Sequence, residues 1–260
     1  MPLAGRHVVV TRPAGQAAHF ATALSGEGAI PVLYPVLEIL DIDDTGPVLD
    51  VAIRLDSFDL AVFVSPNAID RALALILPRR PWPASLRVAA LGKSSELALA
   101  RHGIQDVISP SLRFDSEALL ELPGLTDVRG RRVIIFRGEG GRDVLGDTLR
   151  SRGATVEYVT CYRRVRPHAD PSPLLKLWEE GRLDAVTLTS SEGLRNFFDM
   201  IGRLGQAWLK KTPSFVPHAR IAEQAHTLGL TRVISTGPGD DGLMAGLMQY
   251  FALNGNSRSN

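Results

Sequence analysis

The chain has 260 residues, of which 45% are hydrophobic and 22% charged, and its formal net charge at pH 7 is +1. This is the composition of a soluble globular protein, long enough for one large domain or two ordinary ones. The small charge excludes a general attraction to nucleic acid, and the single cysteine excludes a disulfide framework and a cysteine metal cluster. No apolar run approaches the roughly 18 residues of a membrane span.

Short β-branched runs alternate along the chain with helix-length amphipathic segments. The strand-like runs are 7–10, 60–64, 87–91, 106–108, 132–136, 185–189 and 232–234. The predicted helices are 14–26, 66–77, 94–102, 115–121, 141–152, 191–203, 219–228 and 241–252. Such alternation predicts parallel sheets built from βαβ units, hence an α/β fold. The tail 254–260 is expected to be disordered.

The chain repeats itself after about 125 residues. Residues 5–29 and 130–154 share a GR start, an apolar run, an arginine (Arg12, Arg137) and a closing Gly-Ala. Pieces at 60–69 and 184–193 also correspond. The period is domain-sized, so we expect two similar α/β units with a ligand bound between them.

Two strand-like stretches, 32–41 and 157–166, each follow the first helix of their copy and are longer than the other runs. We interpret them as crossings between interleaved domains, a two-stranded antiparallel connector. The expected first domain is 1–35 with 168–253, the second is 42–157, and the connectors are 36–41 and 158–167.

Polar groups after strands are the candidate ligand contacts. Gly138 begins a glycine cluster at 138–141 that we interpret as a turn exposing backbone N–H groups to an anion. Ser65 and Ser190 end strand runs, and Ser95 follows another in Gly-Lys-Ser-Ser. Ligands of doubly wound sheets bind at this edge, although serine also caps helices without any ligand.

Metal and serine-hydrolase chemistry are not indicated. None of the six histidines stands at metal-ligand spacing with a carboxylate or cysteine, and no G-x-S-x-G sequence occurs. The N-terminal run HVVV is too short for a secretory signal, so we expect a cytoplasmic protein.

The pattern resembles the uroporphyrinogen-III synthase family. The segments that carry the resemblance are 8–39, 63–69 (FVSPNAI), 90–103 (ALGKSSELALARHG), 134–164 and 188–194 (LTSSEGL). The family closes linear hydroxymethylbilane into uroporphyrinogen III, with loss of water and inversion of the last pyrrole ring. The resemblance also implies two α/β domains with a two-stranded connector, and no metal or organic cofactor.

The resemblance assigns roles to several of these residues. Tyr162, in the segment TCYRR, matches the active-site tyrosine, which we expect to assist loss of the hydroxyl group. Ser65 and Ser190 match the cleft serines of the family, and Ser95 matches a position usually held by threonine. All three are expected to bind substrate. Arg12, Arg137 and Gly138 are expected to help bind the substrate carboxylates. The segment 216–224 (VPHARIAEQ) departs from the family pattern, and Cys161 is interpreted as a small buried residue.

Two other functions remain open at this point: a two-lobed small-molecule binding module, and a nucleotide-dependent enzyme that uses the turn at 138–141. For the synthase we expect a monomer whose partners are the linear tetrapyrrole and the upstream bilane-forming enzyme, with no nucleic acid and no membrane.

Overall fold

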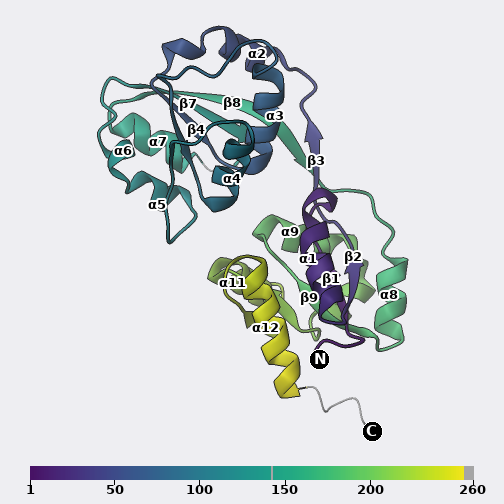
Figure 1. Ribbon diagram of the computed structural model, residues 1–260. Helices are drawn as coiled ribbons and strands as arrows, with labels where there is room; N and C mark the ends of the chain where they lie inside the picture. The colour runs from purple at the N-terminus through teal and green to yellow at the C-terminus, as the bar shows by residue number, and fades with distance from the viewer. Residues whose placement is uncertain (142, 255–260) are drawn as a thin grey trace. The chain divides into compact units, whose positions relative to one another are not determined.

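A computed structural model describes residues 1–141 and 143–254, which form two compact units. Unit 1 comprises Met1–Glu38 and the chain from Val165 onward, and unit 2 comprises Ile39–Arg164. Both units are parallel-sheet α/β structures, so the predicted α/β fold class is confirmed. In each, helices cover both faces of the sheet (Figure 1).

Unit 1 is built on a five-stranded sheet with the order β11-β10-β9-β1-β2, in which all neighbouring strands are parallel. Its strands are β1 (His7–Val10), β2 (Ile30–Leu33), β9 (Leu183–Thr187), β10 (Ser214–Val216) and β11 (Val233–Ser235). Its helices are α1 (Ala14–Gly26), α8 (Ser172–Glu179), α9 (Ser191–Met200), α10 (Gly202–Leu209), α11 (Ala219–Thr227) and α12 (Gly239–Asn254).

The apolar residues of β1 alternate between the two cores of unit 1. Val8 and Val10 pack with α1 and α12, whereas Val9 packs with α9 and α11. A strand with both faces buried needs an unbroken apolar run, which explains the sequence HVVV.

Unit 2 is built on a six-stranded sheet with the order β3-β8-β7-β4-β5-β6. Its strands are β3 (Glu38–Asp41), β4 (Leu60–Phe63), β5 (Arg87–Ala90), β6 (Val107–Ile108), β7 (Arg132–Gly138) and β8 (Thr155–Val165). Its helices are α2 (Gly46–Ile53), α3 (Pro66–Ile76), α4 (Lys93–Arg101), α5 (Ser116–Leu120), α6 (Pro123–Thr126) and α7 (Val144–Ser151), with the 3-10 turn Leu55–Ser57 after α2.

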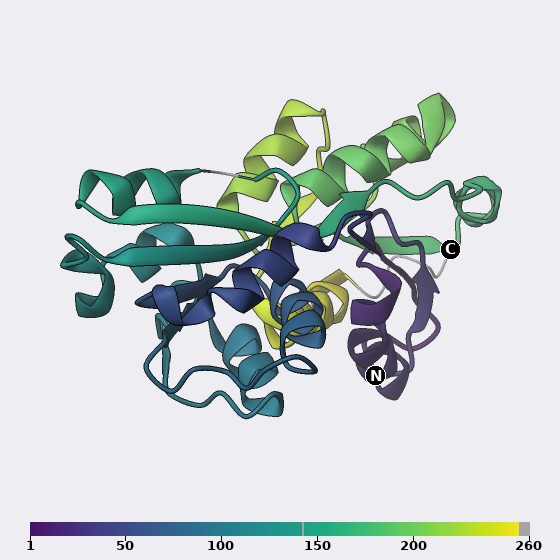
Figure 2. The same cartoon turned by 90° about the horizontal axis from the view of Figure 1, so that it is seen from above.

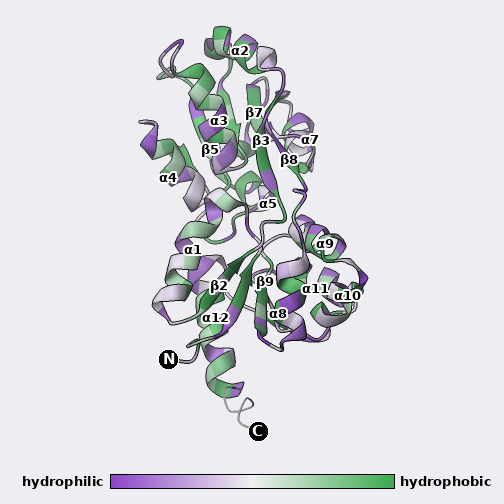
Figure 3. Ribbon diagram, turned by 90° about the vertical axis from the view of Figure 1, so that its right-hand side faces the viewer, coloured by the Kyte–Doolittle hydropathy of each residue, from purple (hydrophilic) through white to green (hydrophobic). Residues whose placement is uncertain are grey.

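The core of unit 2 also has two faces. Ala61 and Phe63 of β4 face the helices α2, α3 and α4, and Leu60 and Val62 face α5 and α7. Phe63 stacks on Phe136 of β7, with ring centroids 4.6 Å apart. Most strand residues of both sheets are hydrophobic, while the helices contain both hydrophobic and hydrophilic residues (Figure 3).

The strands β3 and β8 are neighbours in the sheet of unit 2. The chain enters this unit after Glu38, the first residue of β3, and leaves it after Arg164, near the end of β8. β8 lies beside β7 in the sheet (Figure 2), and the pairing runs from Thr155 as far as Tyr162. Residues 158–162, expected to lie in a connector, therefore belong to the sheet of unit 2.

Several elements differ from the predictions. The expected helix 191–203 is interrupted, because Gly202 has φ +64° and begins the separate helix α10. The helix expected from 141 begins at Val144, because Gly140 and Gly141 have positive φ and prolong the turn. The short strand β10 and the helices α2, α6, α8 and α10 were not predicted. Of the expected tail 254–260, Asn254 ends α12 and the rest lies outside the described residues.

Candidate active site

Ser65 and Ser190 occupy equivalent places in the two units. Ser65 follows β4 and caps α3, where its Oγ accepts the N–H of Ala68 at 3.2 Å. Ser190 follows β9 and caps α9, where its Oγ accepts the N–H of Gly193 at 2.9 Å. Such a cap satisfies a backbone donor that the helix leaves unpaired. Both serines thus lie at the carboxyl edge of a parallel sheet.

A β-bulge determines the face on which Tyr162 lies. Arg137 pairs with Thr160, but the next residue of β7, Gly138, pairs with Tyr162, so Cys161 is the extra residue. Regular alternation would place Tyr162 on the face of Tyr158; instead it packs with Cys161 in the opposite core. Bulges commonly redirect a side chain in this way.

The phenol of Tyr162 contacts Ser65 and Gly138. Its Oη lies 3.1 Å from Oγ of Ser65. A Cβ placed on Gly138 would lie 2.6 Å from Cζ of Tyr162 and 2.9 Å from its Oη, so only glycine leaves room for this ring. The carbonyl of Tyr162 also accepts the N–H of Glu139 at 2.8 Å. With 4% of its surface exposed, Tyr162 is buried in β8 beside Gly138, the last residue of β7.

The hydroxyl contact of Tyr162 differs from those of the other three tyrosines. Tyr34 donates to the carbonyl of Ala169, and Tyr158 donates to the carbonyl of Asp143, both at 3.3 Å. The hydroxyl of Tyr250 accepts from the guanidinium of Arg232. Tyr162 faces a serine hydroxyl, with which either oxygen can be the donor. Its proton is therefore not committed to a backbone carbonyl.

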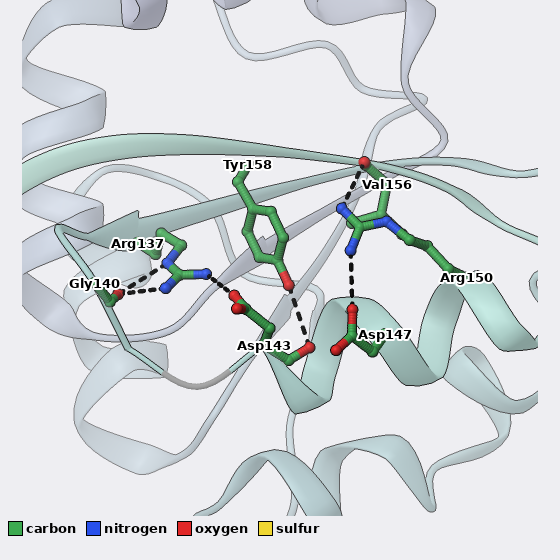
Figure 4. Close-up of polar contacts among 7 residues, drawn as sticks. All are labelled: Arg137, Gly140, Asp143, Asp147, Arg150, Val156 and Tyr158. Carbon is green, nitrogen blue, oxygen red and sulfur yellow. Dashed lines mark hydrogen bonds and ion pairs between the residues drawn. The ribbon is translucent and has the colours of Figure 1, made fainter.

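Arg137 holds the turn that follows β7 (Figure 4). Its Nη1 donates to Asp143 at 2.7 Å, its Nε donates to the carbonyl of Gly140 at 3.1 Å, and its Nη2 donates to the same carbonyl. The guanidinium lies over the ring of Tyr158, 4.6 Å from its centroid. We call Arg137, Gly140, Asp143 and Tyr158 the turn clamp. It ties the glycine turn to β8 and to the start of α7.

Arg12, at the equivalent position of the repeat, makes a similar contact in unit 1. Its Nη1 donates to Asp240 in the first turn of α12, and its guanidinium lies 5.2 Å from the centroid of Phe20. Nδ1 of His19 lies 3.0 Å from the second oxygen of Asp240. Burial raises the pKa of Asp240, but the hydrogen bonds from His19 and Arg12 outweigh it and hold the pKa below its usual value.

Asp143 and Asp240 were not among the predicted site residues. Asp143 lies six positions after Arg137 in a turn with unusual φ values, and Asp240 lies 228 positions from Arg12. No spacing rule joins residues so far apart, so sequence reasoning had no signal for the second pair.

The remaining predicted residues are placed separately. Ser95 is buried in the first turn of α4, beyond β5. Gly92 caps that helix beneath the ring of Phe114. Cys161 is 2% exposed, and burial raises the pKa of its thiol to about 12. A hydrogen bond with the Arg137 backbone lowers this pKa, but by less than burial raises it. The segment 216–224 runs from the last residue of β10 into α11, with His218 at the N-cap.

Within residues 1–141 and 143–254, no helix is long and apolar enough to cross a membrane. The same residues contain no group of three or more His, Cys, Asp or Glu side chains that could hold a metal ion.

Comparison with known proteins gives a consistent result. The family model described as uroporphyrinogen-III synthase HemD matches residues 18–245. Uroporphyrinogen-III synthase of Escherichia coli K12 is 31% identical over 224 residues, which are 85% of this chain and 91% of that protein. The Synechococcus elongatus enzyme of the same name is 32% identical over 80% of this chain and 79% of its own length.

Solved structures share the fold. A mutant uroporphyrinogen III synthase from the extremely thermophilic bacterium Thermus thermophilus superposes with a TM-score of 0.64 at 16% identity, covering 98% of this chain and 100% of that one. The Helicobacter pylori synthetase superposes with a TM-score of 0.56 at 14% identity, covering 95% and 99%. From the family model and the sequence relatives together, we conclude that the chain belongs to the uroporphyrinogen-III synthase family.

Proposed function

We propose that this protein closes hydroxymethylbilane into uroporphyrinogen III, a step of tetrapyrrole biosynthesis, and that Tyr162 supplies the acid. Family membership supports the overall reaction. The observation that carries the assignment of Tyr162 is its hydroxyl contact, which is made with a serine hydroxyl and not with a backbone carbonyl, at the carboxyl edge of the unit 2 sheet.

The first step needs an acid because the hydroxymethyl group leaves as water. A phenol is protonated at neutral pH and can donate to the leaving oxygen as the C–O bond breaks. The substituted carbon of ring D then attacks the resulting azafulvene, which gives a spiro intermediate. The original bridge bond to that carbon breaks, and re-closure through the free carbon of ring D, which then loses its proton, gives the inverted ring. Since the bilane is reactive by itself, the enzyme mainly holds a conformation that favours this route.

Several further groups are proposed to bind the substrate. Ser65, Ser95 and Ser190 offer hydroxyls at or near helix starts, and Gly138 begins a turn whose backbone amides can face an anion. Arg12 and Arg137 are paired with aspartates in this structure, so we propose that they act by holding the loops that present those amides.

We further propose that the protein works in the cytoplasm as a monomer, without metal or organic cofactor, and receives its substrate from the enzyme that makes the bilane. Size-exclusion chromatography with light scattering measures the oligomeric state, and activity after dialysis against a chelator measures any metal requirement.

The reaction is tested by incubating the purified protein with freshly generated hydroxymethylbilane and separating the products. We expect isomer III well above the spontaneous background of isomer I. A product that is only isomer I would overturn the proposal, and nucleotide binding by the same sample would then favour a nucleotide-dependent enzyme.

A further inference from the structure

The hydroxyl of Ser65 has two close polar neighbours, the N–H of Ala68 at 3.2 Å and the Oη of Tyr162 at 3.1 Å. A serine hydroxyl has one proton and two lone pairs. The Ala68 N–H can only donate, so it occupies a lone pair of Oγ. The serine proton then remains available for Tyr162.

From this geometry we infer that Ser65 is a positioning residue, which donates its proton to Oη of Tyr162 and so leaves the phenol proton directed away from Ser65. The inference rests on the proposed function, because it assigns a direction to a hydrogen bond of the acid. If Tyr162 were the donor instead, its phenol proton would be hydrogen-bonded to Oγ of Ser65 and could not be donated to a leaving group.

The same hydrogen bond matters more as the reaction proceeds. When the C–O bond of the hydroxymethyl group breaks, its electron pair stays on oxygen, the Tyr162 proton moves to that oxygen, and water leaves. A phenolate remains, and its charge strengthens the bond from Ser65. The carbon of ring D that closes the macrocycle later loses its own proton, which restores the phenol, so the sum is bilane to macrocycle plus water.

The place of Ser65 at the start of α3 strengthens its role. The N-terminal turn of this 11-residue helix carries a partial positive charge, and Ala68 N–H polarises the serine oxygen. A serine oxygen that accepts this N–H is a stronger donor through its own proton to Oη of Tyr162.

Comparison of the two copies of the repeat distinguishes this role of Ser65 from helix capping. Ser190 stands 125 positions after Ser65 and caps α9 in the same manner. The residue 125 positions before Tyr162 is Leu37, and the one before Gly138 is Pro13. A serine thus caps a helix in both units. The glycine and the tyrosine that lie beside Ser65 in unit 2 are replaced by proline and leucine at the equivalent positions of unit 1.

The test compares Ser65→Ala with Ser65→Thr and with Asp115→Ala. Asp115 caps α5 of the same unit by accepting the N–H of Ala118 at 2.7 Å, so its loss removes a cap far from the acid in sequence. We expect Ser65→Ala to lower kcat by roughly tenfold to a hundredfold, in line with a hydrogen bond to a charged group, and to change KM by less than it changes kcat. Ser65→Thr keeps a hydroxyl at this position and should have most of the wild-type kcat. Asp115→Ala should have the wild-type kcat.

A second measurement, by NMR, detects the hydrogen bond between Ser65 and Tyr162 in the absence of substrate. The chain has four tyrosines, so ring-labelled tyrosine with 13C at Cζ gives four signals, and the Tyr162→Phe variant identifies the one from Tyr162. We expect Ser65→Ala to move this signal, Ser65→Thr to return it toward its original position, and Asp115→Ala to leave it unchanged.

The outcomes separate the two proposals. An active wild type whose kcat is unchanged or raised in Ser65→Ala would overturn the role of Ser65 while leaving the reaction intact. An unmoved Tyr162 signal in Ser65→Ala would do the same. A wild type that makes only isomer I would instead overturn the proposed function, although the signal would still report the contact.

Discussion

The guanidinium of Arg137 donates to the carboxylate of Asp143 at 2.7 Å across the glycine turn that follows β7, and 14% of the Arg137 side chain is exposed. The donors of this guanidinium are therefore used in hydrogen bonds within the turn. Gly138, at the start of this turn, is the residue against which the ring of Tyr162 packs. The turn clamp and the proposed acid are therefore parts of one arrangement.

A mutant cycle at Arg137 and Asp143 tests how the arginine acts. If it holds the turn, Arg137→Ala and Asp143→Ala both raise KM by roughly fivefold, and the double variant is no worse than either single one. Steady-state kinetics on all four proteins measures this coupling. If Arg137 instead bound substrate carboxylates directly, Asp143→Ala would free the guanidinium and lower KM.

Tyr162→Phe removes the proposed acid and keeps the ring. We expect kcat to fall by roughly 10² to 10⁴, as for general acid catalysis, with a small change in Tm because the packing is retained. Tyr250→Phe is the matched control, since its hydroxyl contacts Arg232 on another element and its loss leaves activity in place. More than about half of the wild-type kcat in Tyr162→Phe would contradict the assignment.

Gly138→Ala tests the close approach of strand and ring. The added Cβ would lie 2.6 Å from Cζ of Tyr162, so the ring must move from the position in which its hydroxyl contacts Ser65. We expect a fall in kcat of roughly tenfold or more and a lower Tm, measured by product analysis and thermal unfolding. Gly26→Ala, where nothing lies within 4 Å of the new Cβ, is the control and leaves both values nearly unchanged. Equal effects of the two substitutions would argue against the contact.

Asp240→Asn tests the contribution of the Arg12 pair to stability. The pKa of Asp240 is lowered in the folded protein, so its carboxylate stabilises the fold above the ordinary pKa of 3.8. This contribution is lost as the pH falls through the lower folded value. Urea unfolding should show that the variant is less stable than wild type at pH 7 and that the difference shrinks below about pH 4.

The matched control for this measurement is Asp199→Asn, which removes an ion pair with Arg166 between side chains that are both more than half exposed. Exposed pairs contribute little, so its effect at pH 7 should be small. A stability difference for Asp240→Asn that stayed constant from pH 7 to acid would show that the charge of Asp240 is not responsible.

Cys161 is expected to be unreactive in the native protein. Burial raises the pKa of its thiol to about 12, and only the thiolate is alkylated efficiently. It is the sole cysteine, so mass spectrometry after iodoacetamide treatment at pH 8 gives one clear readout. We expect labelling of the unfolded chain and almost none of the folded one, and Cys161→Ala should retain activity. Rapid native labelling would indicate an accessible thiol.

The sequence alone determined the α/β fold class, the family and the local identity of most elements. These features depend on interactions between residues close in the chain: apolar runs such as HVVV in β1, and the serine that opens α3 or α9. The repeat likewise related Arg12 to Arg137 and Ser65 to Ser190 without any structure.

Only the tertiary structure decided which of these residues touch. Alternation along β8 would have placed Tyr162 with Tyr158, and the bulge opposite Gly138 moved it to the other face, beside a serine 97 positions away. The aspartate that pairs with Arg12 comes from a helix near the other end of the chain. Side-chain direction at a bulge and pairing across such separations depend on how strands register and helices pack, and neither is encoded in a local pattern.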